Sequence, residues 1–235
     1  GFTRLYELTA EPAYLDFASH LMRELDSAQG PRLRPTLLSE GLVSKVGNGK
    51  AYEMLSCIHG MLELGRITGT DDMITAAVTA WDDIRSHHLY LTGTASFGEH
   101  FHRRGDLPGS ASANMGETCV TTTWIQLSAA LYRLTGESRY LDEAERSLFN
   151  QLAAAVGPDG RSWCYYLPLQ GQRDYRYGIE CCSSSGPRAI ALSQALVFAI
   201  DNDDLVVGLY QSAQSIAQLG GTDVAVEMHS GVPFD

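Results

Sequence analysis

The sequence predicts a mainly α-helical chain of stacked helical hairpins that leads into a short β-rich end. A related phrase occurs three times along the 235 residues, at positions 5–9, 64–69 and 131–136. Each copy closes one apolar-periodic segment and precedes another, which is typical of two helices joined by a turn. Near the end of the chain the apolar residues instead gather in short runs, as they do in strands.

The turns of two hairpins are marked by glycine. Gly69 and Gly136 stand where a helix ends and favours a left-handed residue, and the polar residues after them can start the next helix. Helical hairpins cannot bury their apolar faces alone, so repeated copies stack into a solenoid or close into a ring. We therefore expect an α/α toroid. Six hairpins of roughly 60 residues need several hundred residues, so we expect only the C-terminal half here.

Other segments depart from the helical pattern. Residues 92–116 are rich in Gly, Ser, His and Arg and predict a long loop, either functional or a flexible surface loop. Residues 163–167 are short and aromatic, as in a strand, whereas the apolar residues 189–200 predict the last helix. Further strands are predicted at residues 205–210 and 224–228.

These elements predict two regions. We expect residues 1–200 to be the C-terminal part of the helical domain and residues 201–235 to be the start of a β-rich region. The composition, with 44% hydrophobic and 19% charged residues, is that of a globular protein that can bury a sizeable core.

The charge balance excludes some partners. The chain has 17 Lys and Arg against 28 Asp and Glu, a net charge of −11, which disfavours a nucleic-acid backbone or an anionic membrane surface. No run approaches the ~18 apolar residues that span a bilayer. We expect a small, neutral or cationic partner, no nucleic acid and no membrane. Periplasmic or secreted and cytoplasmic locations all stay open, since no basic segment followed by an apolar one is present.

The cysteines point to a thiolate site more than to disulfides. Five cysteines are an odd number in a chain too long to need covalent stapling, so we expect reduced thiols. Glu117 and Cys119 are two residues apart and fall on one side of an extended segment, while Cys181 and Cys182 are adjacent. Three thiolates and one carboxylate make a tetrahedral zinc set. The alternative is that these cysteines are buried as small hydrophobes.

The other two cysteines and the histidines have simpler interpretations. Cys57 lies in an apolar helix and Cys164 in the aromatic strand, and core packing is expected for both. The run 99–102, Glu-His-Phe-His, is a second candidate for metal binding or acid–base work, with a metal-free loop as its alternative. His87 and His88 fit a helix C-terminus, where a histidine interacts favourably with the helix dipole.

A set of motifs carries a resemblance to a known family. The motifs are TGTASFGEHF at 92–101, DLP at 106–108, ETC at 117–119, YLDEAER at 140–146, FN at 149–150, CC at 181–182 and GPR at 186–188. Together they resemble glycoside hydrolase family 127, the β-L-arabinofuranosidase-like enzymes, over roughly residues 45–212 and in the family's order. The pairing of Glu-Thr-Cys with a distant Cys-Cys is specific to that family.

The resemblance implies a fold and a chemistry. The family has an (α/α)6 catalytic barrel followed by β-sandwich modules, so residues 201–235 are expected to begin a sandwich. By resemblance the Zn²⁺ ligands are Glu117, Cys119, Cys181 and Cys182, with Cys181 as the nucleophile and Glu99 as the general acid/base. A zinc-bound thiol is deprotonated and ready to attack an anomeric carbon, and two displacements retain its configuration. The expected substrate is a carbohydrate with a terminal β-L-arabinofuranosyl or related plant-polysaccharide furanosyl residue.

The expected sugar-binding residues are Lys50, His100 and Tyr166. Many family members have Gly-His-Ala, with a histidine that contacts the sugar, where this chain has Lys50. A lysine there can pair with an acidic group on the substrate or simply be a solvated residue at a helix start. After Cys182 the chain has Ser-Ser-Ser-Gly in place of Pro-Pro-Asn, which indicates a different branch of the family.

Two classes of function remain in view from the sequence. One is a retaining glycosidase with a zinc-bound cysteine nucleophile. The other is a non-catalytic α/α carbohydrate-binding or structural module in which zinc holds two segments together. A fragment that is inactive although its parent is an enzyme is a third possibility. The position of Glu99 distinguishes the first two, because a structural site has no use for a carboxylate near Cys181.

Overall fold

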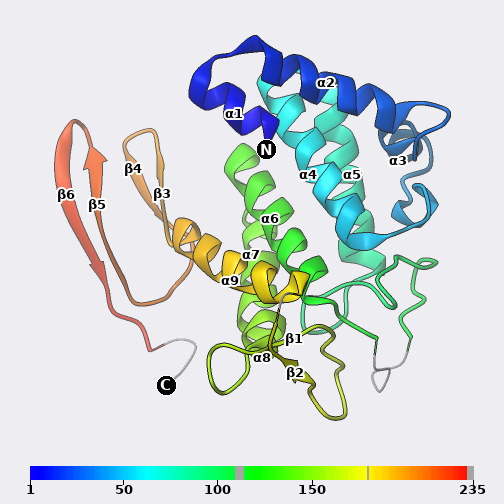
Figure 1. Ribbon diagram of the computed structural model, residues 1–235. Coiled ribbons are helices and arrows are strands. Elements are labelled where there is room, and N and C mark those ends of the chain that lie inside the picture. The colour runs from blue at the N-terminus through cyan, green and yellow to red at the C-terminus, as the bar shows by residue number, and fades with distance from the viewer. Residues whose placement is uncertain (109–113, 179, 232–235) are drawn as a thin grey trace.

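The chain is mainly helical, and its helices pack as hairpins. The computed structural model describes residues 1–108, 114–178 and 180–231. In Figure 1 the helices make up most of the molecule, and two β-hairpins extend from one side. The helices are α1 (Phe2–Thr9), α2 (Pro12–Asp26), α3 (Leu33–Glu40), α4 (Ala51–Thr68), α5 (Asp71–His87), α6 (Thr118–Thr135), α7 (Ser138–Arg146), α8 (Ala153–Ala155) and α9 (Cys181–Ser193). Shorter helical turns are η1 (Val43–Lys45), η2 (Ser147–Leu152) and η3 (Gln194–Leu196).

The predicted hairpins α4–α5 and α6–α7 are confirmed. Gly69 ends α4 with φ 68°, and Gly136 ends α6 with φ 72°, both in the left-handed region. The first hairpin, α1–α2, turns at Ala10 with φ 56°. Helix α4 also packs against α6, and α6 packs against α9, so the hairpins stack side by side. Among the described residues no helix is long and apolar enough to cross a membrane.

The aromatic centre of the core joins three helices. The ring of Trp81 on α5 stacks on Trp124 of α6, with centroids 5.2 Å apart, and packs edge-on against Tyr140 of α7. Trp81 Nε1 donates a hydrogen bond of 2.9 Å to Ser128 Oγ, which satisfies the buried indole. These rings are fully buried. The hairpins are thereby fixed relative to one another, and the starts of α4, α6 and α9 come together on one side.

The strands form three antiparallel pairs. They are β1 (Trp163–Cys164) with β2 (Tyr175–Arg176), β3 (Phe198–Asp201) with β4 (Asp204–Val207), and β5 (Ala213–Leu219) with β6 (Thr222–Met228). In register, Trp163 pairs with Arg176, Phe198 with Val207, and Ala213 with Met228. The strand β3 spans the expected boundary between residues 200 and 201.

Two sequence predictions need correction here, the second at both of its ends. The strand predicted at 163–167 ends at Cys164, because Tyr165 and the residues after it bond to the loop before α6 instead. The last helix begins at Cys181 rather than at residue 189, and η3 ends at Leu196. The apolar residues 198–200 are strand, since they pair with residues 205–207. The predicted loop 92–116 is irregular where it is described, and residues 109–113 lie outside the described residues.

Candidate metal centre and carboxylate site

Three helices begin at the same place, and the residues at their starts carry the candidate chemistry. Lys50 precedes α4, Glu117 precedes α6, and Glu180 precedes α9, whose first residue is Cys181. None of these preceding side chains caps its own helix, so they are available for other contacts. A helix N-terminus favours negative charge, which suits thiolates and carboxylates in its first turn.

The four predicted metal ligands lie together. One ligand atom each from Glu117, Cys119, Cys181 and Cys182 lies within 4.8 Å of all the others. Cys119 Sγ is 3.5 Å from Cys182 Sγ, which is 3.9 Å from Cys181 Sγ. Two sulfurs that bind one tetrahedral zinc at about 2.3 Å lie about 3.8 Å apart. The spacing of the thiols therefore fits a single tetrahedral ion.

The charges in this cluster also fit a cation. Glu117 is 3% exposed, and burial raises its pKa to about 8. The contact with the Cys182 thiol, followed by Ser185, lowers the pKa of Cys119 to about 6, while burial raises that of Cys181. Within the described parts of the chain, no Lys, Arg or His forms an ion pair with the four groups. Such groups become anions together only with a compensating positive charge, which a divalent metal supplies.

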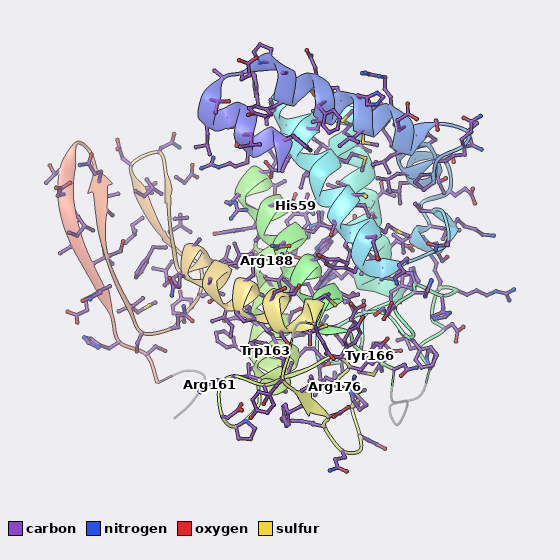
Figure 2. The ribbon with its side chains drawn as sticks, in the orientation of Figure 1. His59, Arg161, Trp163, Tyr166, Arg176 and Arg188 are labelled. Carbon is purple, nitrogen blue, oxygen red and sulfur yellow. The ribbon has the colours of Figure 1, made fainter. Side chains whose placement is uncertain are left out.

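Two glycines allow the chain to build this cluster. Gly116 has φ 69°, and a Cβ there would lie 2.7 Å from Gln151 Nε2, so only glycine fits before Glu117. Glu117 is extended, whereas Cys119 already lies in the first turn of α6, so the two residues are not both in an extended segment as was expected from the sequence. Gly186 lets α9 lie directly against the Trp163 ring, at the position labelled in Figure 2.

A hydrogen-bonded chain supports Cys119 from behind. Cys119 Sγ lies 3.3 Å from Ser185 Oγ, which accepts a hydrogen bond of 3.2 Å from the Arg188 guanidinium. Thr118 Oγ1 donates a hydrogen bond of 2.8 Å to the Cys164 carbonyl, which ties α6 to β1.

The other two cysteines, Cys57 and Cys164, do not belong to the cluster. Cys164 is fully buried, as predicted, and Cys57 is half-buried. All five cysteines are free thiols.

Glu99 is held by three side chains beside this cluster. Its Oε2 is 2.7 Å from Lys50 Nζ, and its Oε1 accepts hydrogen bonds from Tyr165 (2.9 Å) and Tyr166 (2.8 Å). The Lys50 ammonium, followed by the two hydroxyls, lowers the pKa of Glu99 to about 2. Glu99 also has φ 68°, an uncommon backbone conformation for a residue other than glycine. Strain of this kind clusters at functional sites.

Tyr165 contacts both groups. Its hydroxyl donates a hydrogen bond to Glu99, and its carbonyl oxygen lies 3.8 Å from Cys182 Sγ. Tyr165 was not among the site residues predicted from the sequence. Adjacent residues of a strand point to opposite faces, so a strand at 163–167 predicts that only one of the two tyrosines faces the site. Because β1 ends at Cys164, the two rings lie together, with centroids 4.7 Å apart.

The histidines noted in the sequence make local contacts. His100 and His102 follow Glu99 in the same loop. His100 Nδ1 lies 2.7 Å from the Gly98 carbonyl oxygen, and His102 Nε2 lies 2.8 Å from that of Phe97. Among the described residues the only candidate metal group is the Glu–Cys cluster, so the structure offers no support for metal binding by the run 99–102. His87 ends α5, and His88 is buried, with its Nε2 3.5 Å from Asp83.

Comparison with known proteins places the chain in a family. Residues 1–194 match the family model described as the β-L-arabinofuranosidase, GH127 catalytic domain. The chain belongs to this family.

Its relatives are longer than the chain. A non-reducing end β-L-arabinofuranosidase of Bifidobacterium longum subsp. longum is 23% identical over 274 residues, covering 100% of this chain and 41% of the relative. A solved GH127 β-arabinofuranosidase superposes with a TM-score of 0.83 at 27% identity, covering 99% of this chain and 38% of that one. A GH127 β-L-arabinofuranosidase from Geobacillus stearothermophilus T6 has a TM-score of 0.82 at 19% identity, and the match covers 100% of this chain and 42% of that one. The chain thus spans less than half of the relatives it matches.

Proposed function

We propose that the chain is the C-terminal part of the catalytic domain of a retaining glycosidase that removes terminal β-L-arabinofuranosyl or related plant-polysaccharide furanosyl residues. Residues 1–200 would form part of an (α/α)6 barrel, and residues 201–235 would begin a β-sandwich. The proposal is supported by the family and by the named activity of the relatives. The observation that carries it is a carboxylate, Glu99, joined through Tyr165 to the cysteine cluster: the Tyr165 hydroxyl donates a hydrogen bond to Glu99, and the Tyr165 carbonyl oxygen lies 3.8 Å from Cys182 Sγ.

The cluster residues would hold zinc. Glu117, Cys119, Cys181 and Cys182 provide a borderline-soft donor set with the spacing described above, and zinc prefers such sets. When bound, zinc would keep the Cys181 thiol deprotonated near neutral pH. Cys181 is the one exposed member of the four, so its sulfur is the ligand that a substrate can reach.

The reaction would proceed in two displacements. In the first, the Cys181 sulfur forms a bond to the anomeric carbon, the bond to the leaving oxygen breaks, and Glu99 gives that oxygen a proton. In the second, Glu99 takes a proton from water, the water oxygen bonds to the anomeric carbon, and the carbon–sulfur bond breaks. Two inversions give retention, with cysteine in place of the usual second carboxylate.

The ion pair with Lys50 sets a condition on the first step. Glu99 is a carboxylate while the ammonium lies 2.7 Å away, which is the state needed to activate water. To act as an acid, Glu99 must first lose this contact, because the nearby cation favours its charged form. Entry of the sugar between Lys50 and Glu99 would separate them and raise the pKa of Glu99. Lys50, His100 and Tyr166 are the residues we assign to contact with that sugar.

Hydrolysis of an aryl β-L-arabinofuranoside by the zinc-loaded chain tests the proposal. We expect hydrolysis by the wild type, with the retained anomer seen first by NMR, and loss of turnover in Cys181→Ser and in Glu99→Gln. Cys57→Ser is the matched control, because Cys57 lies outside the cluster. Wild-type rates in either site variant would contradict the assignment. A zinc-loaded wild type without turnover would favour the non-catalytic module or a fragment that is inactive although its parent is an enzyme.

A further inference from the structure

Ser185 lies directly behind the candidate metal centre. It is 1% exposed, and its Oγ is 3.3 Å from Cys119 Sγ. Its carbonyl oxygen accepts a hydrogen bond of 3.1 Å from Thr122 Oγ1, and the next residue, Gly186, lies directly against the Trp163 ring. These contacts fix this turn of α9 against α6 and β1. The Ser185 hydroxyl is therefore held beside the Cys119 sulfur in the protein interior.

The Ser185 hydroxyl has one proton, and its surroundings direct that proton to the sulfur. Arg188 Nη2 donates a hydrogen bond of 3.2 Å to Ser185 Oγ, and a guanidinium cannot accept one in return. The hydroxyls of Ser184 and Ser193, in the same helix, instead donate to carbonyls of α9. Among the described residues, the other polar group bonded to Ser185 Oγ is Cys119 Sγ. A metal-bound sulfur has no proton, so in that state the sulfur accepts and the serine donates.

The metal-bound cluster needs such a donor because it would be strongly negative. Three thiolates and one carboxylate carry four negative charges, and a divalent ion cancels two of them. Three of the four ligand residues are buried, where uncompensated charge is costly. A hydrogen bond to one of the sulfurs offsets part of this cost.

Arg188 supplies the positive charge at the other end of this contact. Figure 2 labels Arg188 on α9, which packs against α6. Within the described parts of the chain, no acidic side chain forms an ion pair with Arg188, and its hydrogen bond goes to Ser185. A hydroxyl that accepts from a cation is polarised and becomes a stronger donor. The charge of Arg188 thus reaches Cys119 through the serine.

We propose that Ser185 and Arg188 are positioning residues of the metal centre: Arg188 orients the Ser185 hydroxyl, which donates to the metal-bound Cys119 sulfur and strengthens zinc binding. Both act through Cys119, and neither is one of the four ligands. The inference rests on the proposed function, because it assumes the zinc of that proposal. It also gives a role to the run Ser-Ser-Ser-Gly, where the chain departs from the family pattern.

The zinc affinity of the variants tests this relay without turnover. The Kd for zinc is measured on the whole chain by competition with a chromophoric chelator, at fixed pH and under reducing conditions. In Ser185→Ala we expect about tenfold weaker binding or more, as for other residues that support a metal ligand. Arg188→Met should weaken binding by roughly 3- to 10-fold, because it acts only through the serine. Ser193→Ala, the matched control in α9, should bind zinc like the wild type.

Two further readouts distinguish the relay from a general effect on structure. In the Ser185→Ala background, Arg188→Met should weaken zinc binding by less than about twofold more, because the contact with Cys119 is already broken. In the protein loaded with Co²⁺, Ser185→Ala should move the sulfur-to-cobalt charge-transfer band to lower energy, because a hydrogen bond stabilises the electrons of the sulfur. The band of Ser193→Ala should stay where it is in the wild type.

The outcomes separate this inference from the proposed function. If Ser185→Ala binds zinc as tightly as the wild type, or if its cobalt band does not move, the relay is overturned and the glycosidase proposal stands. Additive losses in the double variant would also overturn the relay, because the serine and the arginine would then act independently. If the wild type binds no zinc, both the relay and the proposed function fail.

Discussion

Lys50 and Glu99 form an ion pair that is fixed by backbone as well as side-chain contacts. Lys50 Nζ is 2.7 Å from Glu99 Oε2, and the Ala51 N–H donates a hydrogen bond of 2.8 Å to the Glu99 carbonyl. The start of α4 is thus attached to the loop that carries Glu99. The sequence suggested that a lysine here would either pair with an acidic group on the substrate or be solvated. In the structure it pairs with the chain's own carboxylate.

Replacing this lysine should change the ionisation of Glu99. In Lys50→Met we expect the pKa of Glu99 to rise from about 2 toward the ordinary value of about 4.5, because the largest cause of its lowering is removed. NMR titration of the Glu99 side-chain carboxyl carbon measures this directly. Lys45→Met, in η1, should leave the pKa unchanged.

The same ion pair makes the stability of the folded protein depend on pH. Because the folded-state pKa is lowered, the ion pair stabilises the folded state above about pH 4.5, and its contribution is lost as the pH falls toward 2. Since the pair is partly exposed, solvent reduces the size of this effect. A Glu99 pKa that stays near 2 in Lys50→Met would show that the two tyrosines, rather than the lysine, hold the charge.

Metal removal should change the reactivity of one cysteine more than that of the others. Among the cluster thiols Cys181 is exposed, whereas Cys119 and Cys182 are buried. Burial raises the pKa of the metal-free Cys181 thiol, whereas zinc would keep this sulfur deprotonated, so at neutral pH a chelator should slow its reaction with iodoacetamide. Mass spectrometry of the alkylated peptides measures the rates. Cys164, which is 0% exposed, should stay unmodified in both states. Equal Cys181 labelling with and without chelator would contradict this.

Two helical glycines should respond oppositely to alanine. At Gly186 a Cβ would lie 2.1 Å from the Trp163 ring, so Gly186→Ala forces a shift between α9 and β1. Overpacking of this kind costs about 1–3 kcal/mol of unfolding free energy. At Gly60 in α4 nothing lies within 4 Å, and Gly60→Ala should stabilise by about 0.5–1 kcal/mol.

Urea unfolding of the two glycine variants provides the comparison. Both sites lie inside helices, so the difference between them isolates the contact with Trp163. Zinc should be held at saturation for both proteins, because a loss of metal would lower stability by itself. If Gly186→Ala were as stable as Gly60→Ala, α9 would not be packed against β1 as described.

The helical hairpins were predictable because their signals are local. Gly69 and Gly136 end α4 and α6 through a backbone conformation that glycine favours, and apolar periodicity marks the helices beside them. The start of α9 was not predictable in this way. Its first residues are Cys, Ser and Gly, which are poor helix formers, and contacts with Trp163 and the thiol cluster hold them. The prediction of a single helix over residues 189–200 was wrong because this apolar stretch is helical at its start and forms a strand at its end.

The candidate site also contains residues that were predictable from the sequence and one that was not. Glu117 and Cys119 were paired from their spacing, and the family resemblance joined them to Cys181 and Cys182; the structure brings all four together. Tyr165 was missed because its place beside Glu99 depends on where β1 ends, which is decided by the bond from the Thr118 N–H to the Tyr165 carbonyl. A contact between segments so far apart in sequence leaves no periodic signal.

The central claim is that one divalent metal binds the Glu–Cys cluster, and metal content per chain tests it most directly. Elemental analysis is made on protein purified under reducing conditions, for the wild type, Cys119→Ala and the control Cys57→Ala. We predict close to one zinc per chain in the wild type and in the control, and a loss of zinc in Cys119→Ala. Zinc-free wild type, or a zinc content unchanged in Cys119→Ala, would contradict the account.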